Sequence, residues 1–224
     1  MNPFSDSKQV SNYAENAARM VPGMRDLPKM AGALLEECVT ADARIIVLGA
    51  GGGLELRALA ESYTSWSFDG IDPSAEMLQL ARTTLGQHAS RVQLHEGYID
   101  TAPMGPFDGA TCLLTLHFLP KAERLRTLQQ MHKRLKTAAP LVVVHHSIPN
   151  QGSEREKWLK RSAGFAIASG MEASQAKSNI PALKDRLPIL TPDEDVELLK
   201  NAGFDGVELF YSAFTFKGWV AYKK

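Results

Sequence analysis

A glycine-rich segment at residues 49–53, Gly-Ala-Gly-Gly-Gly, constrains the fold of this 224-residue chain more than any other feature. It follows an apolar run at 45–48, whose β-branched residues are typical of a buried parallel strand. It precedes residues 54–60, where leucine and alanine recur at helical spacing. A strand, a glycine loop and a helix N-terminus together offer backbone N–H groups and a helix dipole to a ligand. The segment therefore predicts a nucleotide-cofactor site.

The spacing of the glycines separates this loop from the dinucleotide fingerprint. That fingerprint, G-x-G-x-x-G, would place its third glycine at position 54, where this chain has Leu54. The glycines instead follow G-x-G-x-G spacing at 49, 51 and 53. The loop alone is a weak indication of the ligand.

A carboxylate after the next strand is more specific. Residues 67–72 read as a short second strand that ends in Asp72, and residues 73–82 open a helix. An acidic residue about 20 positions past the glycines, at the end of strand two, is placed to accept hydrogen bonds from ribose hydroxyls. We expect Asp72 to be the ribose ligand.

These residues resemble the class I S-adenosylmethionine (SAM)-dependent methyltransferases. The resemblance rests on the glycine loop, on Gly70-Ile71-Asp72-Pro73-Ser74 with Met77, and on Phe107-Asp108-Gly109-Ala110 before a later strand. It extends from about residue 10 to residue 224. It implies an α/β, Rossmann-like class I methyltransferase fold: a seven-stranded, mostly parallel sheet with a C-terminal antiparallel hairpin and an N-terminal helical cap. It also implies SAM as cofactor and S-adenosylhomocysteine as product.

The resemblance also implies which residues would hold the cofactor. In this family the adenine is contacted after the third strand, where an acid usually accepts from the amino group. Tyr98 stands at that position, Ile99 offers a backbone N–H, and Asp100 is an alternative carboxylate if the register shifts by two. The expected cofactor-binding residues are Arg19, Gly49, Ala50, Gly51, Asp72, Pro73, Met77, Tyr98, Ile99, Leu114 and Thr115.

One position departs from the family pattern. The family usually carries an acid where this chain has Val47, so a contact to the methionine ammonium is missing. Glu55, just past the loop, is a candidate substitute. A solvated glutamate in the first turn of the helix is the favoured alternative.

The chain before the first strand predicts two helices, at about 6–20 and 27–39, that form a cap. Its segment 13–23 resembles the corresponding piece of carboxy-SAM synthases, in which an aromatic residue follows Pro-Gly and helps hold the cofactor. This chain has Met24 there. Arg19 and Tyr13 are then candidates for the methionine carboxylate, with purely structural roles equally open.

The remaining chain continues the alternation of strands and helices. Residues 121–136 predict a helix with charge on one face and leucines on the other, and 170–190 reads as an insertion after a helix that ends near 168. The other expected strands are 91–95, 110–116, 141–144, 206–211 and 214–222, the last two joined by a turn at Ser212-Ala213. Such a terminal hairpin argues against an NAD-binding Rossmann domain, which would continue with parallel units.

We expect a single methyltransferase domain over residues 1–224. Its parts are a helical cap at 1–40, a SAM-binding core at 41–150, a lid or insertion at 151–190, and a helix with the terminal hairpin at 191–224. Trp158, Phe165, Met171 and Met24 would give the lid an apolar surface over a small substrate, although core packing explains them equally well.

Histidines near the strand ends are the candidates for proton transfer. His117 follows the fourth strand, near the place where the cofactor methyl would lie, and a neutral imidazole can act as a general base. The alternative, slightly favoured, is that His117 only packs or hydrogen-bonds. His145 and His146 are neighbours on a strand and so point to opposite faces, which excludes a shared metal ion. We expect no metal site.

Charge and composition limit the partners. The chain has 25 basic and 25 acidic side chains, so no net charge draws it to nucleic acid, although a local basic patch stays open. Cys38 and Cys112 suit reduced thiols. No leader pattern or membrane-length apolar run appears, which predicts a cytoplasmic protein. A homodimer is left open.

Three functions fit this sequence. Methyl transfer to a small-molecule substrate is our choice. The second is a SAM-modifying enzyme like the carboxy-SAM synthases, which need an arginine where this chain offers Lys177. The third is a non-catalytic SAM-binding regulator.

Overall fold

The computed structural model describes residues 13–149 and 152–224, so the first part of the helix expected at 6–20 lies outside the described residues. Its centre is a seven-stranded sheet in the order β3-β2-β1-β4-β5-β7-β6. The strands are β1 (Arg44–Leu48), β2 (Ser67–Asp72), β3 (Val92–Glu96), β4 (Gly109–Leu113), β5 (Pro140–His146), β6 (Phe204–Ala213) and β7 (Phe216–Lys223).

The strand pairing confirms the expected topology. β1 pairs in parallel with β2 on one side and with β4 on the other, so Val47 lies between Gly70 and Thr111. β5 pairs in parallel with β4 and antiparallel with β7, and β6 pairs antiparallel with β7. The sheet is therefore mostly parallel, with a C-terminal hairpin. The strand order reverses between β1 and β4, which is where ligands bind in open α/β sheets.

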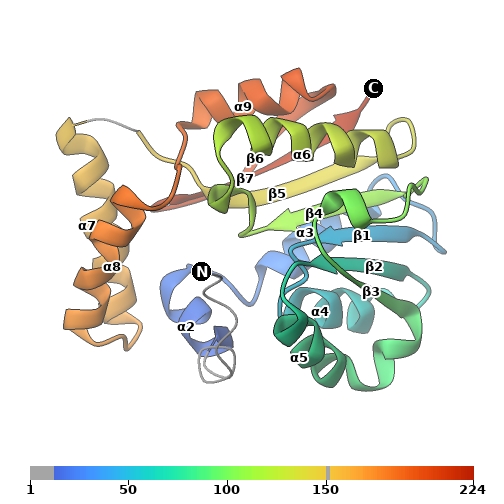
Figure 1. The fold of residues 1–224 in the computed structure, drawn as a ribbon, viewed down its shortest axis with the longest axis horizontal. Coiled ribbons are helices and arrows are strands. Elements are labelled where there is room, and N and C mark those ends of the chain that lie inside the picture. Colours follow the sequence, from blue (N-terminus) through green and yellow to red (C-terminus); the bar gives the residue numbers. More distant parts are fainter. Residues whose placement is uncertain (1–12, 150–151) are drawn as a thin grey trace.

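Helices cover both faces of the sheet (Figure 1). α3 (Leu27–Glu36) and α4 (Leu54–Ser62) bury leucines against Ile45 and Val47 on one face, and α5 (Ala75–Leu85) packs beside α4. α6 (Lys121–Arg134) and α9 (Pro192–Asn201) bury Leu128, Met131 and Leu198 against the other face. Because both faces are covered, the inner strands are continuous apolar runs.

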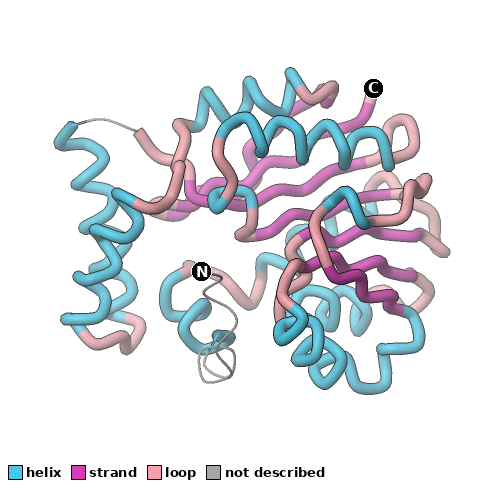
Figure 2. The backbone as a smooth tube through the Cα atoms, in the orientation of Figure 1, coloured by secondary structure: helices cyan, strands magenta, loops and turns pink. Residues whose placement is uncertain are grey.

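Three helices lie beyond the ends of the strands. α7 (Gly152–Ala168) and α8 (Ala173–Asp185) form an antiparallel pair beside the sheet (Figure 2). α2 (Tyr13–Met20) packs against α7. α3, expected as part of the cap, instead belongs to the layer on the sheet, because Leu27, Ala31 and Leu35 are buried there. Helix α8 occupies most of the segment at 170–190 that was expected to be an insertion.

Two boundaries differ from the sequence expectation. β4 ends at Leu113 and does not reach residue 116, because Leu114 takes φ +58°, which turns the chain out of the sheet, although the Leu114 N–H still donates to Val144 O at 2.6 Å. A short 3₁₀ helix, η3 (Leu116–Phe118), follows. The hairpin turn is at Phe214-Thr215, with Phe214 at φ +50°, and Ser212-Ala213 belongs to β6.

Candidate functional site

A cavity of about 300 Å³ lies at the ends of β1 and β4, where the strand order reverses. Its walls come from α2, from the turn before α3, from the glycine loop with the start of α4, and from the end of β4. The lining residues are Glu15, Ala18, Met24, Arg25, Leu27, Pro28, Gly49, Ala50, Gly51, Gly52, Leu54, Glu55, Ala58, Leu113 and Leu114. The predicted loop residues Gly49, Ala50 and Gly51, together with Leu114, therefore share one cavity.

The conformation of the glycine loop requires glycine. Gly49, Gly51 and Gly53 have φ values of +80°, +50° and +81°, in the left-handed region. A Cβ on Gly49 would lie 1.9 Å from Thr115 Oγ1, so the loop and the chain after β4 are in direct contact. The N–H groups of Gly49 and Ala50 both donate to Ile71 O, at 2.8 and 2.9 Å. The loop is thus anchored to the end of β2.

Asp72 connects the glycine loop to the start of α5. Its Oδ2 accepts from Gly51 N at 2.9 Å and its Oδ1 from Ser74 N at 2.9 Å. Burial raises the pKa of Asp72, whereas these two N–H donors act to lower it. A carboxylate oxygen has more than one lone pair, so each oxygen can still accept a hydroxyl. This arrangement supports Asp72 as a ribose ligand, and that role is a proposal.

The other predicted loop neighbours have distinct positions. Met77 is buried, and its Cε lies 3.4 Å from the position of a Cβ on Gly51, so it supports the loop from beneath. Pro73 is exposed at the start of α5. The Thr115 hydroxyl donates to Leu113 O at 3.1 Å, which orders the turn after β4.

The segment expected around an adenine divides into exposed and buried parts. Tyr98 is 61% exposed and Ile99 is buried. Asp100, the alternative carboxylate, accepts from Arg126 Nη1 at 2.8 and 2.9 Å. Asp100 is therefore engaged on the surface of α6, which leaves Tyr98 and Ile99 as the proposed adenine contacts.

Glu55 is partly buried, so it is less solvated than the favoured expectation had it. It lines the cavity from the first turn of α4, and its Oε1 has no solvent exposure and no hydrogen-bond partner among the described residues. Desolvation raises the pKa of Glu55 to about 7, and the Thr111 hydroxyl acts in the opposite direction. No hydrogen bond of regular geometry joins the two groups, because Thr111 Oγ1 also lacks a partner among these residues.

The basic residue on the cavity wall is Arg25, which the sequence did not single out. Arg19 lines an adjoining hollow with Glu15 and Arg25, and its guanidinium is 3.7 Å from the Glu15 carboxylate. Arg25 directly follows Met24, which lines the cavity as well. The place of Arg25 next to the Pro-Gly turn is the signal that could have indicated it.

The other apolar residues expected in a lid each pack against other parts of the chain. Trp158 lies under Arg161, Phe165 contacts the Phe214 ring, and Met171 is buried in a small cluster with Met20. These contacts are of the core-packing kind, so Met24 is the residue of the expected lid surface that reaches the cavity wall.

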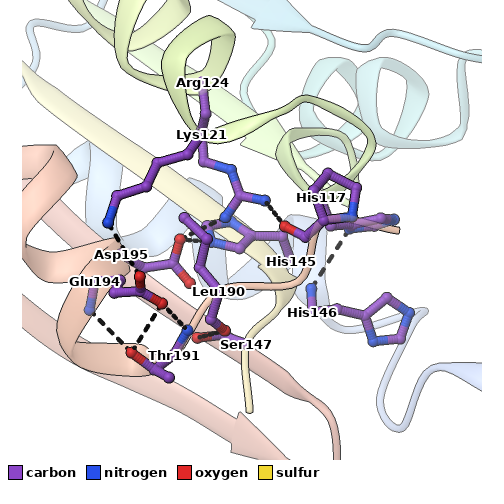
Figure 3. A network of polar contacts seen from close by, with 11 residues as sticks. His117, Lys121, Arg124, His145, His146, Ser147, Leu190, Thr191, Glu194 and Asp195 are labelled. Atoms are coloured by element: carbon purple, nitrogen blue, oxygen red, sulfur yellow. Dashed lines mark hydrogen bonds and ion pairs between the residues drawn. The ribbon is translucent and has the colours of Figure 1, made fainter. Parts of the chain in front are cut away.

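His117 lies in η3 and is 5% exposed. Its Nδ1 accepts from His146 N at 3.4 Å, and the two imidazole rings are 4.8 Å apart (Figure 3). Burial holds the pKa of His117 well below its ordinary value, so the ring is neutral. A neutral ring that accepts at Nδ1 carries its proton on Nε2 and cannot accept another proton there. This geometry favours the packing alternative for His117 over the general base.

His145 and His146 point to opposite sides of β5. His146 Nδ1 is 2.9 Å from Thr215 Oγ1, and His145 Nε2 is 3.2 Å from Asp195 Oδ1. Within residues 13–149 and 152–224, no three His, Cys, Asp or Glu side chains are grouped as metal ligands. No helix in these ranges has the length and apolar character needed to cross a membrane.

The fold, the cavity at the ends of β1 and β4 and the glycine loop define a class I methyltransferase-like protein. Residues 45–138 match a family model described as a methyltransferase domain. The chain is therefore similar to class I SAM-dependent methyltransferases, and the matched segment is less than half of its length.

Particular relatives are similar along nearly the whole chain. The carboxy-S-adenosyl-L-methionine synthase of Chromohalobacter salexigens is 27% identical over 97% of this chain and 82% of its own length. That of Methylococcus capsulatus is 26% identical over 100% of this chain and 95% of its own.

Solved structures share the fold. Magnesium protoporphyrin IX methyltransferase of Synechocystis has a TM-score of 0.69 at 13% identity, over 99% of this chain and 97% of that one. A Nostoc punctiforme protein assigned as an O-methyltransferase has a TM-score of 0.68 at 19% identity, over 96% of this chain. This chain spans 59% of that protein's length.

Proposed function

We propose that the protein binds SAM in the cavity at the ends of β1 and β4 and transfers its methyl group to a small molecule. The observation that carries the proposal is the contact between the glycine loop and Asp72, since Gly51 lines the cavity and donates to Asp72 Oδ2 at 2.9 Å. This contact joins the loop backbone to the Asp72 carboxylate, which supports a cofactor surface with a ribose ligand beside it. The Synechocystis relative, whose chain is covered almost completely, was crystallised with S-adenosylhomocysteine.

The chemistry asks little of the protein. SAM supplies its own electrophile, a methyl group on a sulfonium, so the chain must position the two reactants and exclude water. The glycine loop, Leu113 and Leu114 would define the position of the cofactor. Few polar groups with catalytic capacity are needed, which agrees with the neutral, buried state of His117.

A second function is favoured by the relatives themselves. The two relatives described above are named carboxy-SAM synthases, and the similarity covers nearly all of this chain. An enzyme of that kind would hold an extra carboxylate on the cofactor. Lys177 on α8, the sequence candidate for that contact, and Arg25 are both exposed, but only Arg25 of the two lines the cavity. Arg25 is therefore the better candidate for a second carboxylate.

Mass spectrometry of the ligand retained on purification separates these functions, followed by titration with SAM, S-adenosylhomocysteine and carboxy-SAM. Methyl transfer predicts bound SAM or S-adenosylhomocysteine, and release of S-adenosylhomocysteine with an acceptor. Retained carboxy-SAM would favour the second function. Binding of SAM with no turnover across a broad acceptor screen would favour a regulator. Failure to bind any of the three ligands would contradict the proposal. The small-molecule acceptor, the cytoplasmic location and the choice between monomer and homodimer stay predictions.

A further inference from the structure

The turn before α3, residues 21–26, forms one wall of the cavity. Its Met24 and Arg25 line both the cavity and the adjoining hollow. Val21 is buried and Met24 packs against the same apolar cluster beneath α3 and α4. Gly23 lies between them at φ +66°, and a Cβ placed there would have no atom within 4 Å. Packing on that side therefore does not fix the orientation of the Pro22–Gly23 peptide.

A hydroxyl from the C-terminal hairpin contacts this peptide. Tyr211 Oη, on β6, donates to Pro22 O at 2.6 Å, although the two residues are 189 positions apart. Among the described residues, no other hydrogen bond reaches Pro22 O. The internal hydrogen bonds of the turn end on Val21 O and Gly23 O, on either side of it. Tyr211 thus supplies the tie between this peptide and the sheet.

The direction of the Tyr211 side chain depends on an irregularity in β6. In a regular strand alternate residues share a face, so Tyr211 would point the same way as Leu209, which is 56% exposed. From Leu209 to Tyr211 the pairing advances two positions along β6 but only one along β7, which is a β-bulge. Phe210 and Tyr211 accordingly both pack against the apolar cluster beneath α3 and α4. A bulge that redirects a side chain is a recurrent device next to active sites.

The Tyr211 hydroxyl remains a donor over the whole neutral range. Burial raises its pKa to about 12, so the group is not ionised at any pH near neutrality. Its hydrogen bond to Pro22 O is therefore a permanent feature of the folded chain.

We propose that Tyr211 is a positioning residue for the cofactor cavity. This inference rests on the proposed SAM-binding function. By fixing the Pro22–Gly23 peptide, the hydroxyl holds Met24 and Arg25 on the cavity wall before the cofactor arrives. A wall that is in place for only part of the time lowers the apparent affinity by that fraction, so Tyr211 strengthens binding without touching the ligand.

The first test is Tyr211→Phe, which removes the hydroxyl and keeps the ring against the apolar cluster. Thermal unfolding should show a folded variant. Calorimetric titration should show about 3–10-fold weaker binding of S-adenosylhomocysteine, the effect of losing one uncharged hydrogen bond. Tyr222→Phe is the matched control, because Tyr222 packs against the same cluster from β7 but lies opposite Pro140, where β5 begins. It should bind like the parent.

A second test asks whether Tyr211 acts through the turn. If it works by holding Met24 and Arg25, its hydroxyl should matter little once both side chains are removed. In the Met24→Ala/Arg25→Ala background we expect Tyr211→Phe to change the affinity by less than about twofold. The amides of Met24 and Asp26, which donate within the turn, should also exchange faster in unliganded Tyr211→Phe than in Tyr222→Phe.

The outcomes distinguish the inference from the function on which it rests. A lower unfolding midpoint with unchanged affinity in Tyr211→Phe would make the tyrosine merely structural. An equal loss of affinity in Tyr222→Phe, an equal loss with and without the side chains of Met24 and Arg25, or unchanged amide exchange would mean that Tyr211 does not act through the turn. Each of these results overturns the inference while SAM binding stands. A parent protein that does not bind S-adenosylhomocysteine overturns both.

Discussion

Arg124 and Asp195 form an ion pair in which both side chains are buried. Arg124 Nη1 donates to Asp195 Oδ1 at 2.5 Å, and each side chain is 1% exposed. Arg124 Nη2 donates to Pro188 O at 3.0 Å, and His145 Nε2 lies 3.2 Å from the same Asp195 oxygen (Figure 3). The pair therefore fixes α9 and the segment before it onto α6 and β5, close to the loop that carries His117.

Replacing one member of this pair should be much worse than replacing both. Asp195→Leu leaves Arg124 as an uncompensated buried charge, which should lower the free energy of unfolding by about 3–5 kcal/mol. Arg124 Nε and Asp195 Oδ2 lack partners among the described residues, so the pair is not fully satisfied even in the parent. The double variant Arg124→Met/Asp195→Leu should therefore recover a large part of the loss. Urea unfolding measures both.

Lys121→Met is the matched control for the buried pair. In the parent, Lys121 Nζ contacts Glu194 Oε1 at 3.0 Å and so also joins α6 to α9, but the Lys121 side chain is half exposed. An exposed pair of this kind contributes about 1 kcal/mol or less. Equal losses of unfolding free energy in Lys121→Met and Asp195→Leu would contradict the inference that burial makes the Arg124–Asp195 pair sensitive to the loss of one partner.

Alanine at Gly49 and at Gly51 should have different effects. At Gly49 the new Cβ meets Thr115 Oγ1 at 1.9 Å, so the loop or the chain after β4 must move, and we expect a clear loss of stability. At Gly51 the nearest atom is the flexible end of Met77 at 3.4 Å. Gly51→Ala should fold at a cost of about 1 kcal/mol for its positive φ.

Gly51→Val should abolish cofactor binding, because a β-branched side chain at positive φ, directed against Met77, must displace the loop backbone that meets the cofactor. Thermal unfolding and calorimetric titration separate the two glycines. Full affinity for S-adenosylhomocysteine in Gly51→Val would place the cofactor elsewhere.

Asp72→Ala should weaken binding of S-adenosylhomocysteine at least about tenfold, because each charge-assisted hydrogen bond to a ribose hydroxyl contributes roughly 1.5–3 kcal/mol and water replaces it only in part. The variant also removes the acceptor for Gly51 N and Ser74 N, so the loop should become more mobile. Hydrogen exchange of these amides in the unliganded protein tests the second effect. Unchanged affinity would remove Asp72 from the ribose site.

His117→Gln should retain most of the turnover. A glutamine oxygen can accept from His146 N in place of Nδ1, and the His117 ring is already neutral because burial depresses its pKa. The pH profile of kcat between about pH 6 and pH 9 should then be the same in parent and variant. Loss of a general base would instead lower kcat by about 10²–10⁴-fold at constant cofactor affinity, and that result would restore the catalytic role.

Glu55→Gln should stabilise the unliganded protein at alkaline pH. The folded pKa of Glu55 is about 7 against an ordinary value of 4.5, so the folded state binds more protons than the unfolded state between these values. The contribution of Glu55 to the free energy of unfolding is therefore highest below pH 4.5 and falls as the pH rises toward 7. The variant should gain at most about 3 kcal/mol at pH 8 and almost nothing near pH 4. A gain that is independent of pH would contradict the burial of the ionised group.

Local patterns predicted the parts of the site that depend on chain geometry alone. The glycine loop and Asp72 come together because each parallel strand is followed by a tight loop and a helix. Two such units lie side by side in the sheet, so the loops after their strands are neighbours. The capping box of α9, in which Thr191 and Glu194 exchange hydrogen bonds, is likewise local in the sequence. These features need no information from distant residues.

Contacts between distant segments decided what the sequence missed. Leu114 leaves the strand with φ +58° while its N–H stays bonded to Val144 O of β5, a combination that no run of apolar residues reveals. Glu55 Oε1 is out of contact with solvent, near the Thr111 hydroxyl of β4, although a glutamate at that position in a helix is ordinarily solvated. The sequence pattern placed Arg124 on the charged, exposed face of α6. Arg124 is instead buried, because it pairs with Asp195, which is 71 positions away.

The position of β7 has a consequence for biosynthesis. β5 completes its hydrogen bonding only when β7 arrives, about 70 residues later, which at ribosomal rates means a delay of roughly 3–14 s. During that interval β5, with its run of three valines, is an open and apolar sheet edge on the nascent chain. Slow codons between residues 147 and 215 would prolong this interval, and chaperones that cover apolar strands would act in it.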